Sequence, residues 1–186
     1  MRVIVGGIGY RNLRDHSVGV AVTDHLEWRD WPDNVVVEDL SYGPIAVVQR
    51  FEDETAERRF GRAVFVAAVA RGDGRPLGTM TAYRWDGVLP SDELIQGSVC
   101  EAVTGVIALD NTLIVGRHFR ALPDEIVVVE VEPVIHEAGE TFGPVVQGCF
   151  EPLCELVTRL ALDPAAASRL PVAPLGGRVR PVAGTR

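Results

Sequence analysis

The amino-acid sequence predicts a three-layer α/β/α fold built on a mixed sheet of about five strands. Two observations favour this α/β fold. Short apolar runs rich in β-branched residues alternate with segments in which apolar residues recur at helical spacing. The chain also has 186 residues, 47% of them hydrophobic, which is enough for one well-buried core. We expect residues 1–162 to form this single domain.

The chain opens with a strand and a glycine-rich turn. Residues 2–8 form a short apolar run of mainly β-branched residues, which predicts a buried strand. Gly6, Gly7 and Gly9 interrupt this run, as glycines do where the backbone turns sharply or approaches another segment closely.

A polar loop and a helix follow the first strand. Ser17 can cap a helix over residues 18–26, in which apolar residues recur every four positions. Asp15 and His16 lie in the loop just before this helix. In an open α/β sheet, ligands bind outside the carboxyl ends of the strands, so Asp15 and His16 are the first candidates for chemistry.

The next segments predict three strands and one short helix. Residues 35–40 form a strand with Asp39 at its carboxyl end, and residues 45–54 can form an amphipathic helix. Residues 63–70 are nearly all apolar, as expected for a central strand buried on both faces. Residues 71–76 predict a turn, in which we expect the Gly-Asp-Gly-Arg run of residues 72–75 to project into solvent. Residues 78–84 alternate in polarity, which predicts a strand at the sheet edge.

The last third of the chain predicts two helices around one strand. Residues 98–115 have helical periodicity, although Gly105 weakens a helix at that point. Residues 126–131 give the clearest strand pattern. Residues 144–162 predict a final helix that Pro152 should kink. Residues 163–186 are dominated by Pro, Ala, Gly and Arg, which predicts a mostly disordered tail.

Composition narrows the classes of partner. The formal net charge is −8 and no basic cluster interleaves with aromatic residues, so neither nucleic acid nor an anionic membrane surface is an expected partner. No apolar run reaches the length of a membrane span. The first residues lack the features of a signal peptide, which favours the cytoplasm.

The cysteines do not predict a disulfide framework. Cys100, Cys149 and Cys154 are odd in number and widely spaced, and the interval between the last two is not that of a metal knuckle. We expect packed thiols. The first turn also fits a dinucleotide site poorly, because residues 10–12 contain no third glycine and the helix begins several residues later.

Several motifs, taken in order, resemble the hydrogenase maturation proteases. These small α/β endopeptidases trim the C-terminal extension of the large subunit of nickel–iron hydrogenases once nickel is in place. The resemblance covers residues 1–162. The matching motifs are Gly7-Ile-Gly-Tyr10, Asp15-His-Ser-Val-Gly-Val20, Val37-Glu-Asp39 followed by Gly43, Pro76-Leu-Gly-Thr79, Val129-Glu-Val-Glu-Pro133 and Phe142-Gly-Pro-Val-Val146.

The resemblance implies a nickel site in which most expected ligands are replaced. The family binds nickel through an acidic residue after the first-loop Asp, an Asp ending the central strand and a His starting a later helix. His16 occupies the first of these positions. The second falls on Ala67 or Ala68, which cannot ligate a metal. The third falls on Gly105 or, in a shifted match, on Cys100. Nickel accepts imidazole and thiolate, so His16 and Cys100 are the metal-ligand candidates.

Two functions remain open from the sequence. The first is an endopeptidase that processes the C-terminus of a nickel–iron hydrogenase large subunit, with nickel recognised in the substrate, no intrinsic cofactor and an activated water as nucleophile. The second is a catalytically impaired relative that binds a hydrogenase or a similar partner as an assembly factor. Residues that the site could recruit, the first two of them as catalytic candidates, are Asp15, Asp39, Asp73, Glu101 and His136.

Overall fold

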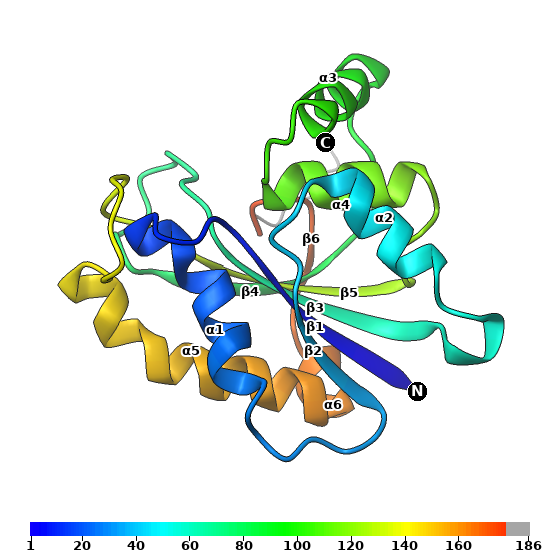
Figure 1. Cartoon of the computed structure of the whole chain (residues 1–186), viewed down its shortest axis with the longest axis horizontal. Coiled ribbons are helices and arrows are strands. Elements are labelled where there is room, and N and C mark those ends of the chain that lie inside the picture. The colour runs from blue at the N-terminus through cyan, green and yellow to red at the C-terminus, as the bar shows by residue number, and fades with distance from the viewer. Residues whose placement is uncertain (178–186) are drawn as a thin grey trace, which may run out of the picture.

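A computed structural model describes residues 1–177 and shows a six-stranded sheet between two layers of helices (Figure 1). The strands are β1 (Arg2–Ile8), β2 (Val35–Asp39), β3 (Phe60–Ala68), β4 (Met80–Trp85), β5 (Glu125–Val131) and β6 (Val172–Ala173). The α-helices are α1 (Val18–Leu26), α2 (Pro44–Glu52), α3 (Asp92–Val103), α4 (Leu109–His118), α5 (Pro144–Leu162) and α6 (Pro164–Ser168). Two short 3₁₀ helices are η1 (Arg14–Ser17) and η2 (Ala56–Arg58). The predicted three-layer α/β/α fold is confirmed.

The sheet is mixed, as the sequence predicts, and it has six strands where about five are predicted. Its strand order is β2-β1-β3-β5-β4-β6. The first four strands in this order run parallel, whereas β4 runs antiparallel to β5 and β6 runs parallel to β4. The carboxyl ends of β1, β3 and β5 therefore meet at one edge, and the loops after β1 and β5 gather there (Figure 1).

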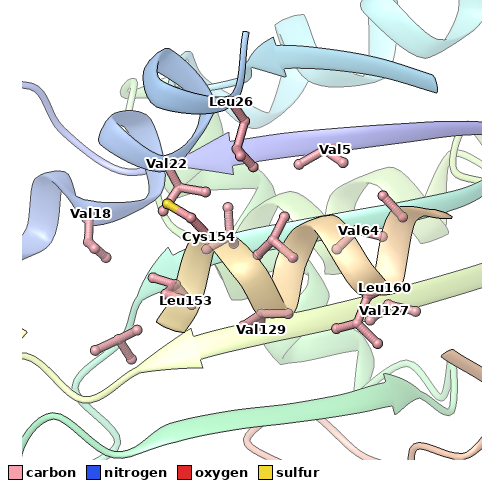
Figure 2. Packing of buried hydrophobic residues seen from close by; sticks show 14 of the residues in the cluster. Val5, Val18, Val22, Leu26, Val64, Val127, Val129, Leu153, Cys154 and Leu160 are labelled. Carbon is pink, nitrogen blue, oxygen red and sulfur yellow. The ribbon is translucent and has the colours of Figure 1, made fainter. Parts of the chain in front are cut away.

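The core has one layer on each face of the sheet. Helices α1 and α5 cover one face, where Val22 and Leu153 pack over strand residues such as Val64 (Figure 2). Helices α2 and α4 cover the other face, where Leu113 packs with residues such as Phe65. Because Val64 and Phe65 are both fully buried on opposite faces, β3 is the central strand that its apolar sequence predicts.

One of the helix predictions differs from the structure. The predicted helix over residues 98–115 is two helices, α3 and α4. Gly105 separates them because it adopts a left-handed conformation with φ of +83°, which ends a helix and suits glycine. Helix α3 also begins earlier than predicted, at Asp92. Helix α5 continues through Pro152 from Pro144 to Leu162.

The predicted disordered tail is wrong for residues 164–177. Asp163 accepts a hydrogen bond from the backbone N–H of Ala165 at 2.8 Å and so caps α6. Strand β6 then pairs with β4 and buries Ala173, so β4 is not the edge strand that its alternating pattern predicts. The remainder of the predicted tail, residues 178–186, lies outside the described residues. Within residues 1–177, no helix is long and apolar enough to cross a membrane.

Glycines set the distance between α1 and the sheet. A Cβ at Gly7 would collide with the carbonyl of Gly19, and a Cβ at Gly19 would collide with the carbonyls of Ile8 and Val66. The predicted close approach at the first glycines is therefore confirmed, and it brings the start of α1 against the ends of β1 and β3.

This close packing predicts opposite effects for two helical Gly→Ala substitutions. Gly19→Ala should lower the free energy of unfolding by about 1–3 kcal/mol, because the new methyl group meets backbone that cannot yield easily. Gly97→Ala in α3 should raise it by up to about 1 kcal/mol, because nothing lies within 4 Å of the new Cβ and alanine favours the helix. Urea denaturation followed by circular dichroism measures both. Equal effects would contradict this account.

Candidate functional site

Asp15 is buried between the loop after β1 and the loop after β5. Its side chain is fully inaccessible to solvent. The Oδ2 atom accepts hydrogen bonds from the backbone N–H groups of Val134 and Ile135, both at 2.9 Å. The Oδ1 atom accepts one from Gly143 at 2.7 Å. A single carboxylate thus fastens the loop after β5 at both of its ends, and such charge-assisted bonds are stronger than neutral ones.

Backbone pairing also joins these two loops. The N–H of Arg14 donates to the carbonyl of Gly139 at 3.0 Å, and the N–H of Gly139 donates to the carbonyl of Asn12 at 2.9 Å. Asn12 and Arg14 have positive φ values of 60° and 43°, which for arginine is a strained conformation. The Ser17 side chain does not cap α1 as predicted. Its Oγ instead accepts a hydrogen bond from the N–H of Leu13 at 2.8 Å, across η1.

The two fastened loops bring His16 and His136 together. The Nε2 atom of His16 lies 3.0 Å from Nδ1 of His136, and the two rings meet edge to face with centroids 4.5 Å apart. His16 is half-buried and His136 is exposed. Burial, and secondarily the neighbouring His136, lowers the pKa of His16 below its ordinary value, while Asp15 opposes this shift. This shift favours the neutral form of His16, in which an imidazole can bind a metal.

Asp39 lies at the carboxyl end of β2 and is held as a carboxylate. It accepts hydrogen bonds from the backbone N–H of Ser41 at 2.9 Å, from the Ser41 hydroxyl, and from Arg11 at 2.7 Å. Burial alone would raise the pKa of Asp39, but these hydrogen bonds outweigh it and hold the pKa below its ordinary value. Since Arg11 also bonds Asp24, Asp39 belongs to a charged network beside the first loop.

A buried charge cluster at the carboxyl end of β5 is a feature that the sequence did not predict. Arg71 donates two hydrogen bonds to Asp110, at 2.6 and 2.9 Å, and two more to Glu130, one of them at 2.8 Å. The Glu130 side chain is 1% exposed and that of Arg71 is 12% exposed. The prediction that residues 72–75 project into solvent is wrong for the Arg75 side chain, which is 13% exposed and pairs with Asp73.

The same charge cluster holds the segment that follows β6. Tyr83 donates its hydroxyl hydrogen to Glu130 at 2.6 Å and accepts the N–H of Gly176 at 3.0 Å. Arg75 bonds the carboxylate of Asp73 at 2.7 Å and the carbonyl of Gly176 at 2.9 Å. Arg71 and Arg75 thus form ion pairs with the carboxylates at this end of the sheet. These include Asp73, one of the residues that the sequence offers as a further member of the site.

The remaining candidate residues, Cys100 and Glu101, lie away from His16 and His136. Cys100 and Glu101 lie on α3, which is on the opposite side of the sheet from α1 and stands away from the first loop (Figure 1). Cys100 lines a groove of about 600 Å³ with Ile95, Val99 and Phe119 among its walls, and His16 is not part of it. Glu101 accepts a hydrogen bond from Asn111 at 2.6 Å.

The cysteines only partly match the expectation of packed thiols. Cys154 is fully buried, and burial raises the pKa of its thiol to about 11. Cys149 is half-buried and donates to the carbonyl of Gly78 at 3.3 Å, whereas Cys100 is exposed. At the end of β3, Ala67 is buried and supplies no ligand. Among the described residues, no group of three or more His, Cys, Asp or Glu side chains is arranged to hold a metal.

Comparison with solved structures identifies the fold. The chain is similar to the hydrogenase maturating endopeptidase HybD from E. coli, with a TM-score of 0.62 and 22% identity over 86% of this chain and 92% of that one. It is similar to the [NiFe] hydrogenase maturation protease HycI from Thermococcus kodakarensis, with a TM-score of 0.63 and 18% identity over 87% and 93% of the two chains. It also matches a hydrogenase 2 maturation peptidase from a Thaumarchaeota archaeon, with a TM-score of 0.59 and 21% identity over 88% and 100%.

These likenesses show that the chain has the fold of the hydrogenase maturation endopeptidases. The resemblance inferred from the sequence motifs is thereby confirmed for the fold. No protein-family profile matches the sequence, and no curated protein matches it.

The three hydrogen bonds to Asp15 predict a large loss of stability when its carboxylate is removed. Asp15→Ala should lower the free energy of unfolding by at least about 3 kcal/mol, because three backbone N–H groups lose a buried acceptor. Asp24→Ala removes a carboxylate that is 45% exposed and should cost less than about 1 kcal/mol. Guanidinium denaturation of both variants measures the difference. A loss for Asp15→Ala no larger than that for Asp24→Ala would show that these bonds do not fasten the loops.

The network around Asp39 predicts stability that depends on acidity. Because its folded pKa lies below the unfolded value of about 3.9, the ionised group stabilises the fold above that pH. This contribution is lost as the pH falls through the folded pKa. The wild-type protein should therefore be more stable than Asp39→Asn at pH 7, and the gap should close on acidification. Denaturation curves at stepped pH measure it, and a gap that persists unchanged to pH 2 would contradict the assignment.

Proposed function

We propose that this chain is an endopeptidase of the hydrogenase maturation type, which trims the C-terminus of a nickel–iron hydrogenase large subunit after nickel insertion. The observation that carries this proposal is the shared fold, which extends over 86–88% of the chain in the three comparisons. A shared fold alone does not define an activity, so the proposal also depends on the loop after β1. That loop presents His16 at the sheet edge where ligands of α/β proteins bind.

In this proposal, His16 contacts the nickel ion that the substrate carries. Nickel is then part of the substrate, and the chain needs no intrinsic cofactor. Imidazole is a suitable nickel ligand, so replacing an acidic residue by histidine changes the ligand without removing it. Cys100 is not included as a second ligand, because it lies on α3 in a groove that does not contain His16.

The two catalytic candidates receive different roles in the proposal. Asp15 is fully buried and already accepts three backbone hydrogen bonds, so it acts as a positioning residue for His16. Asp39 remains ionised through Arg11 and Ser41, which makes it a poor proton acceptor at neutral pH. A metal ion can polarise a carbonyl and activate water, so peptide hydrolysis does not require a nucleophilic side chain of this protein.

The second candidate function is an assembly factor that binds the same partner without cutting it. One observation favours it: Ala67 and Ala68 end the central strand where the resemblance implies an aspartate ligand. The carboxylates nearest that strand end in the sheet, Glu130 and Glu132, contact Arg71 and Arg75 instead. With either function we expect a cytoplasmic protein, and the net charge of −8 favours a partner that is neither nucleic acid nor an anionic membrane surface.

A processing assay separates the two functions. The purified chain is incubated with a nickel-loaded large-subunit precursor from the same genome, and mass spectrometry follows the loss of its C-terminal extension. We expect cleavage that requires nickel, and we expect His16→Ala to slow it at least about tenfold, or about 1.4 kcal/mol of transition-state stabilisation. His118→Ala, which changes an exposed histidine at the end of α4, serves as the control. Co-elution with an uncut precursor would contradict the peptidase and support the assembly factor.

A further inference from the structure

We propose that His16 and His136 together form a binding site for a divalent transition-metal ion of the nickel, cobalt, copper or zinc type. Their Nε2 and Nδ1 atoms face each other at 3.0 Å. Within residues 1–177, neither nitrogen has another hydrogen-bond partner in the protein. Imidazole nitrogen is a preferred ligand of these ions, whereas Mg²⁺ and Ca²⁺ prefer oxygen ligands.

The distance between the two nitrogens fits the edge of a coordination sphere. Ligand nitrogens about 2.05 Å from one ion lie about 2.9 Å apart when the angle at the ion is 90°, and about 3.3 Å apart at the tetrahedral angle. The observed separation of 3.0 Å falls between these values. In the metal-free chain one of these two nitrogens donates its N–H to the other. On binding, that imidazole takes its other tautomer, with the proton on its second ring nitrogen, and both lone pairs turn toward the ion. The exposed ring of His136 has the freedom to do so.

Hydrogen bonds hold the backbone that carries His16 and His136 without any bound ion. Asp15 is adjacent to His16 in the sequence, and its carboxylate holds the N–H groups of Val134 and Ile135, just before His136. The pairing of Arg14 with Gly139 holds the far side of the same loop. Since both ligands extend from restrained backbone, little backbone entropy is lost on binding, which favours chelation.

Two protein ligands leave the other coordination positions of the ion open. No third His, Cys, Asp or Glu side chain completes the site among residues 1–177. The pair therefore suits an ion that already carries ligands from another molecule. This last step rests on the proposed function, in which the ion belongs to the hydrogenase large subunit. Binding of the metal alone does not depend on that function.

Calorimetric titration of the full chain with nickel chloride, using a preparation without a histidine tag, tests the site. The chain has four histidines, so the double variant His25→Ala/His118→Ala keeps His16 and His136 as its only histidines. We expect this double variant to bind one nickel ion with the wild-type Kd. His16→Ala and His136→Ala should each raise the Kd at least about tenfold, which is what loss of even an outer-shell partner of a metal ligand costs.

A nickel Kd unchanged by His136→Ala would overturn the proposal. A second measurement on the wild-type protein avoids any folding defect of the variants. Paramagnetic cobalt should broaden the imidazole NMR signals of His16 and His136 and spare those of His25 and His118. Broadening centred on His118, beside Cys100, would overturn the proposal as well. Metal binding without peptide cleavage would leave the site standing and reject only the proposed peptidase.

Discussion

The hydrogen bonds between the Asp15 carboxylate and three backbone N–H groups are the constraint on which the candidate site depends. They connect segments about 120 residues apart in the sequence and close the carboxyl edge of the sheet. A loop of mostly exposed residues such as the one after β5 would otherwise have little reason to adopt one conformation. Because Asp15 precedes His16 directly and its partners precede His136, one buried carboxylate sets the position of both rings. The strained backbone at Arg14 is held by the same assembly.

Ion pairing at the carboxyl edge of the sheet determines which side chains remain available to bind a ligand. Glu130, Glu132 and Asp110 contact Arg71, so these acidic side chains stabilise the loops around β5 and are poorly suited to bind an ion. Unpaired buried carboxylates would be strongly destabilising, which explains why two arginines enter the interior. The histidines differ from these carboxylates because they contact each other and are partly accessible to solvent. The chain thus has the fold of the maturation endopeptidases. Under the proposed function, His16 offers an imidazole where the resemblance implies an acidic ligand.

Local sequence patterns were sufficient for five of the six strands, β1 to β5, and for the loop after β1. The strand, turn and helix near Gly7 could be predicted because their signals, β-branched runs and glycines, lie in neighbouring residues of the sequence. Gly105 signalled a helix break, but the pattern alone did not show that two helices result. The order of α6 and β6 depends on pairing with β4, which composition cannot reveal. Arg71 lies 59 residues from Glu130, and His136 lies 120 residues from His16. The sequence therefore named His16 and His136 separately but could not show that they meet.

Amide hydrogen exchange of the wild-type protein tests the central claim, that Asp15 fixes the two loops, most directly. The N–H groups of Val134, Ile135 and Gly143 belong to loop residues yet donate to a buried carboxylate. We predict that these three amides exchange as slowly as amides in the outer strands of the sheet, while neighbouring loop amides exchange rapidly. Exchange of all three at the rate of exposed loop amides would contradict the account, because the histidine pair would then have no fixed backbone beneath it.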